Sequence, residues 1–238
     1  KGIPMKSAVM LVAILTAFAS SARGSTIYSS YDEFYAGQSS AAFGDPIEHD
    51  ASALYSDRGG DVYGDFGVEL GGKTVHVEVA GNRLTIGGRT YRFSKATTFP
   101  GEHPIEIYPG SARVFFAERP HHQPSALCVE GEGSGSGEAN RHRQIYLLID
   151  PLAPKGGATL LHLPSLLSSC RAVLTTQDGK LAFPKNSYLL DGAQESRIGL
   201  LMSYYVFEKR RFVPALNDIR LRFVRPDVPF QFSVQGAE

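Results

Sequence analysis

The chain has 238 residues, a formal net charge of zero and 42% apolar residues, which is the composition of an ordinary globular protein. Its 24 basic residues are balanced by 24 acidic ones, so the sequence predicts no nucleic-acid partner held by bulk charge.

Residues 1–22 have the features of a secretory signal peptide. Lys6 precedes an apolar run of about a dozen residues, which is too short to span a bilayer, and Ala17-Phe18-Ala19 is a pattern that signal peptidases process. We expect Met5 to be the initiator, with residues 1–4 upstream of it. No later apolar run is long enough for a membrane helix, so we expect no membrane span. No Asn lies in an N-x-Ser/Thr sequon, which favours a bacterial source and a periplasmic or secreted location.

Residues 23–238 are expected to form a single β-rich domain. One short helix is predicted at 29–37, because Ser29 or Ser30 can cap its start and Gly37 can end it. Residues 38–65 are rich in Ser, Gly and Asp and are expected to be loop.

Residues 66–94 predict a four-stranded antiparallel meander. Gly71-Gly72, Gly81-Asn82 and Gly87-Gly88 separate runs of alternating apolar and polar residues, as type I′ or II′ hairpin turns do. With two-residue loops at these three places, every apolar residue falls on one face of the sheet. The predicted pairs are Phe66 with Val77, Val68 with Val75, Val79 with Leu84, Val77 with Ile86, and Leu84 with Tyr91.

Further strands are expected along the rest of the chain. Residues 144–150 and 158–163 are apolar on both faces, which is typical of strands in the middle of a covered sheet. The other predicted strands lie at 104–108, 112–118, 126–130, 171–176, 180–183, 219–225 and 230–234.

Three connecting or ambiguous segments complete the chain. Residues 131–143 are rich in Gly and Ser and predict a flexible hairpin tip. Pro164 is expected to open a helical turn. Residues 198–212 fit either a strand pair or an amphipathic helix, and their β-branched and aromatic content favours strands.

About a dozen strands with one short helix and no regular βαβ spacing predict an all-β fold. We expect an antiparallel β-sandwich or a partly closed barrel.

Cys128 and Cys170 predict a disulfide. They are the chain's two cysteines, and an exported protein folds in an oxidising compartment. Their apolar neighbours favour a structural bridge over a reactive thiol.

No standard catalytic motif is present. The sequence lacks a G-x-S-x-G elbow, a phosphate-binding loop, H-E-x-x-H and C-x-x-C, so we expect no cofactor and lean against an enzyme. The alternative is a carboxylate–histidine pair on the meander's polar face, formed by Glu69 or Glu78 with His76. Glu69 and His76 are diagonal neighbours in the predicted register.

Two clusters have the residue types of a metal site. His121 and His122 are potential zinc ligands, and Asp57, Asp61 and Asp65 could supply oxygens to calcium. Neither cluster has the spacing of a known metal motif, so solvated loop residues are the simpler interpretation and we expect no metal.

The candidate binding residues lie near the C-terminal end of the sequence. They combine aromatic anchors with positive charge, as protein-interface hot spots do, although core packing and a solvated strand face also explain them. These residues are Tyr204, Tyr205, Phe207, Lys209, Arg210, Arg211, Arg220 and Arg222.

The leading hypothesis is an exported periplasmic, non-enzymatic module that binds another envelope or secreted protein, with inhibitor or immunity-type proteins as an analogy. One alternative is an envelope hydrolase or lyase that acts on saccharide or peptide through the carboxylate–histidine pair. The other is a carrier of a small apolar ligand inside a barrel.

Overall fold

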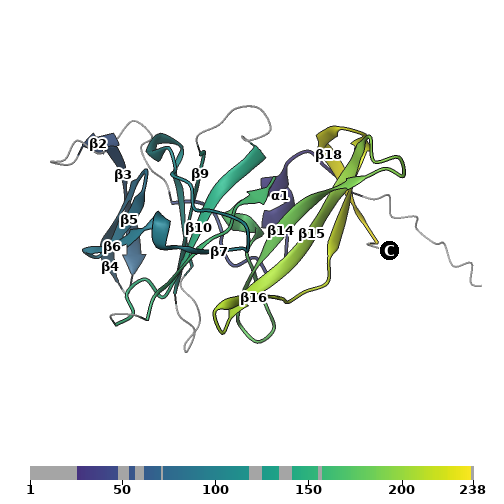
Figure 1. Ribbon diagram of the computed structural model, residues 1–238. Helices are drawn as coiled ribbons and strands as arrows, with labels where there is room; N and C mark the ends of the chain where they lie inside the picture. The colour runs from purple at the N-terminus through teal and green to yellow at the C-terminus, as the bar shows by residue number, and fades with distance from the viewer. Residues whose placement is uncertain are drawn as a thin grey trace, which may run out of the picture.

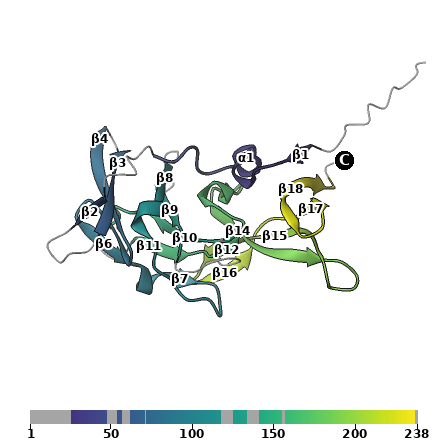
Figure 2. The same cartoon turned by 90° about the horizontal axis from the view of Figure 1, so that it is seen from above.

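The computed structural model describes residues 26–47, 54–56, 62–70, 72–117, 125–133, 141–154 and 157–236. Over these residues the chain is mostly β-structure, with one α-helix, α1 (Tyr31–Ala36). Three sheets form three successive layers (Figures 1 and 2), and their pairs are antiparallel apart from one parallel pair, β7 with β11. The all-β prediction is confirmed: two sheets face each other as a sandwich, and a third curls like half a barrel.

The outer layer is the predicted meander. Its five strands, in spatial order, are β2 (Leu54–Ser56), β3 (Val62–Leu70), β4 (Lys73–Ala80), β5 (Arg83–Ile86) and β6 (Arg89–Arg92). All five predicted register pairs are confirmed, and the apolar face is buried. The edge strand β2 and residues 62–65 of β3 lie within the segment that the sequence assigned to loop. That assignment is therefore wrong for these residues, because β4 is long enough to pair with β3 from its start.

The turns of the meander differ from one another. Gly87 and Gly88 both have positive φ, 54° and 75°, as a type I′ turn requires. Neither Gly81 nor Asn82 has a positive φ, so the prediction of a primed turn there is wrong. A later segment of the same chain contacts this turn: the carbonyl of Gly81 accepts a hydrogen bond from the Ile107 N–H at 2.9 Å.

The central layer has both faces covered. Its strands are β7 (Thr97–Thr98), β8 (Arg113–Ala117), β9 (Ala126–Gly131), β10 (His142–Ile149), β11 (Thr159–His162) and β12 (Ser165–Leu166). Every residue of β9 is buried. Leu127 and Leu148 pack on the meander, whereas Cys128 and Leu147 pack on the opposite side. The prediction of covered strands at 144–150 and 158–163 is confirmed.

The third layer is a seven-stranded sheet that curls around α1. Its strands are β1 (Ile27–Tyr28), β13 (Leu174–Thr175), β14 (Leu181–Leu190), β15 (Arg197–Glu208), β16 (Arg211–Pro214), β17 (Ile219–Arg225) and β18 (Val228–Gln235). The strand interpretation of 198–212 is therefore confirmed as the β15–β16 hairpin.

The predicted helix is confirmed as α1, which lies against this curled sheet. Ser30 caps it by accepting a hydrogen bond from the Glu33 N–H at 3.3 Å, and Gly37 ends it. Phe34 and Tyr35 are buried against Met202 and other residues of the sheet.

Two local predictions are wrong, and a third, the strand at 171–176, holds only for β13 (Leu174–Thr175), because Cys170–Ala172 forms a 3₁₀ turn. Residues 104–108 form no strand, because they share single hydrogen bonds with several neighbours rather than a ladder with one. The phenol of Tyr146, for example, donates to the Ile105 carbonyl. Pro164 opens no helical turn; the short strand β12 follows it, and a 3₁₀ turn forms only at Cys170–Ala172. Two further 3₁₀ turns lie at Phe93–Lys95 and Pro109–Ser111.

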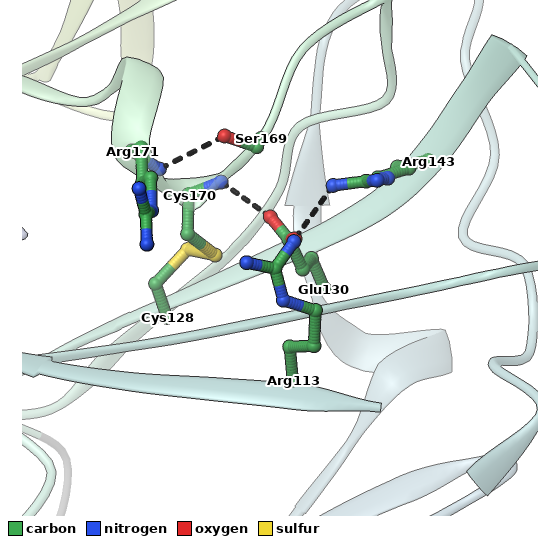
Figure 3. Close-up of a disulfide and its surroundings, with 7 residues drawn as sticks. All are labelled: Arg113, Cys128, Glu130, Arg143, Ser169, Cys170 and Arg171. Atoms are coloured by element: carbon green, nitrogen blue, oxygen red, sulfur yellow. Dashed lines mark hydrogen bonds and ion pairs between the residues drawn. A yellow bond between two sulfur atoms is a disulfide. The ribbon is translucent and has the colours of Figure 1, made fainter. Parts of the chain in front are cut away.

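The predicted disulfide between Cys128 and Cys170 is present (Figure 3), with Cα atoms 5.9 Å apart. It ties β9 of the central sheet to the 3₁₀ turn at Cys170–Ala172, which packs beside α1. Among the described residues no helix is long and apolar enough to cross a membrane.

Candidate functional site

The β15–β16 hairpin presents the predicted basic residues on an exposed turn. Glu208 pairs with Arg211, so Lys209 and Arg210 are the two central turn residues. Their φ angles are 47° and 66°, as in a type I′ turn, where Asn-Gly is the usual sequence. A lysine and an arginine therefore occupy backbone positions that disfavour side chains with a Cβ.

The cations of this turn point to solvent. Lys209, Arg210 and Arg211 are all exposed. Within the described part of the chain none of them forms an ion pair; the adjacent Glu208 carboxylate pairs with Lys180 instead. We call these three residues the basic turn.

The predicted aromatic residues lie behind the basic turn rather than on its surface. Tyr204 is buried in the curled sheet, and this burial raises the pKa of its phenol above the ordinary value. Tyr205 packs edge-on against Phe99, with 5.4 Å between ring centroids. Phe207 lies against Phe212 at 5.2 Å. These rings pack at the base of the hairpin, where Tyr205 and Phe207 are partly buried, and the cations are the most exposed side chains of this set.

Arg220 and Arg222 are exposed on β17 but lie apart from the basic turn. Arg220 pairs with Leu201, seven residues along β15 from Glu208. At about 3.3 Å per strand residue this places them roughly 23 Å apart. The eight candidate binding residues therefore do not form one patch.

The predicted carboxylate–histidine set is also divided. The imidazole of His76 contacts Asp65, with 3.1 Å between Nδ1 and Oδ2, and its side chain is 70% exposed. Glu69 accepts a hydrogen bond from Thr74, its partner across the sheet. Glu78 lies opposite Asp65 on β3. Within the described residues no hydrogen bond or ion pair joins His76 to Glu69 or Glu78.

The candidate metal ligands lie mostly beyond what the structure describes. His121, His122, Asp57 and Asp61 are outside the described residues, and Asp65 lies in β3 beside His76. In the described ranges no group of three or more His, Cys, Asp or Glu residues is arranged to hold a metal ion.

A buried charge cluster beside the disulfide was not foreseen from the sequence (Figure 3). Glu130 on β9 has no exposed surface. Its Oε1 accepts hydrogen bonds from Arg113 at 2.9 Å and from Arg143 at 2.8 Å, and its Oε2 accepts the Cys170 N–H at 2.6 Å. Asp32 of α1 contacts Arg113 at 3.1 Å. Arg113 and Glu130 face each other in the β8–β9 register. A correct prediction of that strand pair would therefore have placed the two side chains together.

The cluster joins α1 to the central sheet. Burial raises the pKa of Glu130, whereas Arg143, the Cys170 N–H and Arg113 oppose that rise. Because the carboxylate accepts donors from β8, β10 and the turn at Cys170, it fixes how these elements meet.

Comparison with protein-family models, with curated proteins and with solved structures finds no match for this chain.

Proposed function

We propose that this protein is an exported, non-catalytic binding module that attaches through its basic turn to an acidic surface of another periplasmic or secreted protein. The observation that carries the proposal is the left-handed backbone of Lys209 and Arg210, which keeps two cations at a position better suited to Asn and Gly.

Fold stability does not explain why Lys209 and Arg210 occupy these two turn positions. Left-handed backbone is unfavourable by about 1–2 kcal/mol for each residue with a Cβ. No ion pair within the described chain offsets that cost. Strained backbone that neighbouring structure maintains is found preferentially at functional sites, so an intermolecular role for the charges accounts for their presence.

A protein partner fits the form of the surface. The basic turn stands on a packed base of aromatic rings, with Phe99 stacked on Phe212 at 4.3 Å, so its cations are presented on a rigid support. Preorganised arginines are frequent hot spots of protein interfaces. An anionic membrane gains only about 1 kcal/mol per basic residue near its surface, which is weak for three charges.

Export rests on two supports. The first 22 residues have the pattern of a signal peptide, and the Cys128–Cys170 disulfide is compatible with an oxidising compartment. The missing N-x-Ser/Thr sequons favour a bacterial envelope over a eukaryotic secretory pathway.

The double substitution Lys209→Asn with Arg210→Gly tests the turn. We expect it to raise the free energy of unfolding by about 1–2 kcal/mol, because it supplies the preferred I′ residues. Urea unfolding measures this change. Arg211→Gln is the matched control: it removes a charge next to the turn without a change at a left-handed residue, and its stability should stay within about 0.5 kcal/mol of the wild type.

Zero-length carbodiimide cross-linking in the intact envelope of the source cell tests the partner. This reagent joins a lysine only to a carboxylate that it touches, so Lys209 should be recovered linked to an Asp or Glu of a second protein. Arg211→Gln should lower that yield several-fold. Exposed Lys73, on β4, is the reference lysine. Recovery of Lys209 linked only within its own chain, or no more often than Lys73 to other proteins, would refute the proposal.

A further inference from the structure

A groove lies beside the basic turn, on the face of the curled sheet that also packs on α1. Its volume is about 730 Å³, within the range of about 300–1,000 Å³ that is usual for ligand clefts. The turn 176–180, which joins β13 to β14, lies on one side of β15, and residues 213–217 of β16 and the connection after it lie on the other. The groove therefore crosses β15 next to the basic turn and has room for a short segment of chain.

The centre of the groove is apolar. Val206 of β15 and Val213 of β16 face each other in the register, and both pack in the core around α1. Ala215 packs against the same core, and Leu216 is 38% exposed in the connection between β16 and β17. The groove therefore offers apolar surface that the described chain covers only in part, and this surface suits an aliphatic side chain.

Two side-chain amides lie on opposite sides of this apolar centre. Gln177 is in the turn on the β14 side, and Asn217 is in the connection on the β16 side; both are exposed. Each amide carries a hydrogen-bond donor and an acceptor, which are the groups that a peptide backbone also presents. A segment that lies along the groove can therefore bond to both sides through its backbone.

The charges inside the groove are matched, whereas those of the basic turn are not. Lys180 pairs with Glu208 and, at 2.5 Å, with Asp178, so this part of the groove has no excess positive charge. Among the described residues the three cations of the basic turn form no ion pair. A negative charge on a partner is therefore attracted to the turn end of the groove and not to its middle.

The strand register sets the spacing between the charged end and the apolar centre. Glu208 pairs with Arg211 and Val206 with Val213, so Arg211 lies on the same face of the hairpin as Val213. These two residues are two positions apart on β16, which is about 7 Å along a strand. Residues two positions apart in an extended partner segment also share a face and have the same separation. A segment beside β16 can therefore place one side chain on Arg211 and the next one of that face on Val213.

On the basis of the function proposed above for the basic turn, we propose that the groove binds an extended segment of the partner in which an acidic residue stands two positions from a branched aliphatic residue. The acidic side chain contacts Arg211 and the rest of the basic turn. The aliphatic side chain packs on Val213 and Leu216, and backbone hydrogen bonds to the two amides hold the segment in place. The partner is thus recognised by an acid–x–aliphatic pattern and not by negative charge alone.

Titration of the full chain with two synthetic peptides tests this pattern, with amide chemical shifts as the readout. The peptides are N-acetyl-Glu-Ser-Glu-Ser-Leu-Ser-Leu amide and the reverse sequence, N-acetyl-Leu-Ser-Leu-Ser-Glu-Ser-Glu amide, because the segment can run in either direction. We expect saturable shifts in β16 and in the turn 176–180 with at least one of them. Replacement of both leucines by serine, or of both glutamates by glutamine, should weaken its binding at least tenfold. No saturable shift with either peptide at millimolar concentration, or equal binding after the leucines are replaced, would overturn the proposal.

Variants of the protein assign the apolar contact. Leu216→Ser removes exposed apolar surface outside the strands without a change of charge, and it should weaken binding of the peptide several-fold. Leu190→Ser is the matched control, because Leu190 is 45% exposed at the far end of β14 in the same sheet and does not line the groove. It should bind as the wild type does. Wild-type affinity in Leu216→Ser, or an equal loss in both variants, would contradict the assignment.

Carbodiimide cross-linking in the intact envelope separates a failure of the groove from a failure of the basic turn. Leu216→Ser keeps all three cations of the turn, so a lower yield of Lys209 linked to a second protein reports on the groove. We expect that yield to fall several-fold in Leu216→Ser and to stay at the wild-type level in Leu190→Ser. An unchanged yield in Leu216→Ser would refute the groove and leave the function of the basic turn standing. Absence of the intermolecular product in the wild type would refute the basic turn, and the groove with it.

Discussion

His162 is a buried titratable side chain in the central sheet, and it has no exposed surface. Its Nε2 lies 2.8 Å from the Gln144 side-chain oxygen, and its ring stacks on Tyr146 at 4.7 Å. Its Nδ1 has no hydrogen-bond partner among the described residues. Burial lowers the pKa of His162 from 6.5 to about 4, so the folded protein keeps this imidazole neutral.

His162 predicts a loss of stability in acid. The unfolded chain takes up this proton near pH 6.5 and the folded chain near pH 4, so the contribution is full above pH 6.5 and is lost as the pH falls toward 4. The pKa difference corresponds to about 3 kcal/mol. Urea unfolding at pH 7.5 and pH 4.5 should show a smaller pH dependence in His162→Gln than in the wild type. Identical slopes for the two proteins would contradict the argument.

The environment of Glu130 predicts that Glu130→Gln lowers the free energy of unfolding, although the two side chains are nearly the same size. In Glu130→Gln the carboxylate that pairs with Arg113 and Arg143 is lost, and because these arginines are 32% and 40% exposed and still contact Asp32, we expect a loss of about 1.5–3 kcal/mol, as for hydrogen bonds to charged groups. Asp45→Asn is the control, because Asp45 pairs with Arg171 but its side chain is 90% exposed; we expect a change below about 1 kcal/mol. Thermal melting of both variants measures the difference, and equal melting temperatures would show that Glu130 is not structurally important.

Neither of these residues was predictable from sequence alone. His162 is a lone polar residue in an apolar strand, and Glu130 ends another. Their roles depend on partners from distant strands, Gln144 for His162 and Arg113 and Arg143 for Glu130. Side-chain alternation indicates which face a residue occupies but not which strand will lie beside it.

Among the elements, the meander was the most predictable part. Its hairpins are local, and a register slip of one residue would move every apolar side chain to the wrong face, so the pattern allows one solution. The strand predicted at 104–108 shows the opposite case. Its alternation is that of a strand, but no neighbouring strand is available to pair with it, and the sequence carries no local sign of that.

Val77 tests the buried face of the meander. It has no exposed surface and packs between the meander and the central sheet. Val77→Ala should lower the free energy of unfolding by about 1–3 kcal/mol. Thr85→Ala, on the opposite face, is the control and should change it by less than about 0.5 kcal/mol. An unchanged urea midpoint for Val77→Ala would show that this face is not core.

For the basic turn, the sequence predicted the residues but not their backbone conformation. The sequence singled out Lys209, Arg210 and Arg211 as candidate binding cations, but it grouped them with Arg220, Arg222 and buried Tyr204. The left-handed backbone of Lys209 and Arg210 follows from the β15–β16 register, which no local residue preference reveals.

For the whole molecule, the disulfide predicts a stability loss on reduction. Cys128 and Cys170 are 42 residues apart, and the loss of chain entropy in the unfolded state gives about 4 kcal/mol for such a loop, as an upper figure. The double variant Cys128→Ala with Cys170→Ala should lose up to this amount in urea unfolding. Intact mass after alkylation under denaturing, non-reducing conditions should show no added alkyl group, and two added groups would rule the bridge out.

The central sheet is covered on one face by the meander and on the other by the curled sheet. The meander buries its apolar face against this shared sheet, whereas the curled sheet buries part of its apolar surface there and the rest around α1, and β9 is buried throughout. A cut between layers would therefore leave two fragments that each expose an apolar sheet. A gene fragment that encodes the meander alone would therefore expose to water the apolar face that the central sheet covers in the whole chain, which makes it a poor unit for recombination.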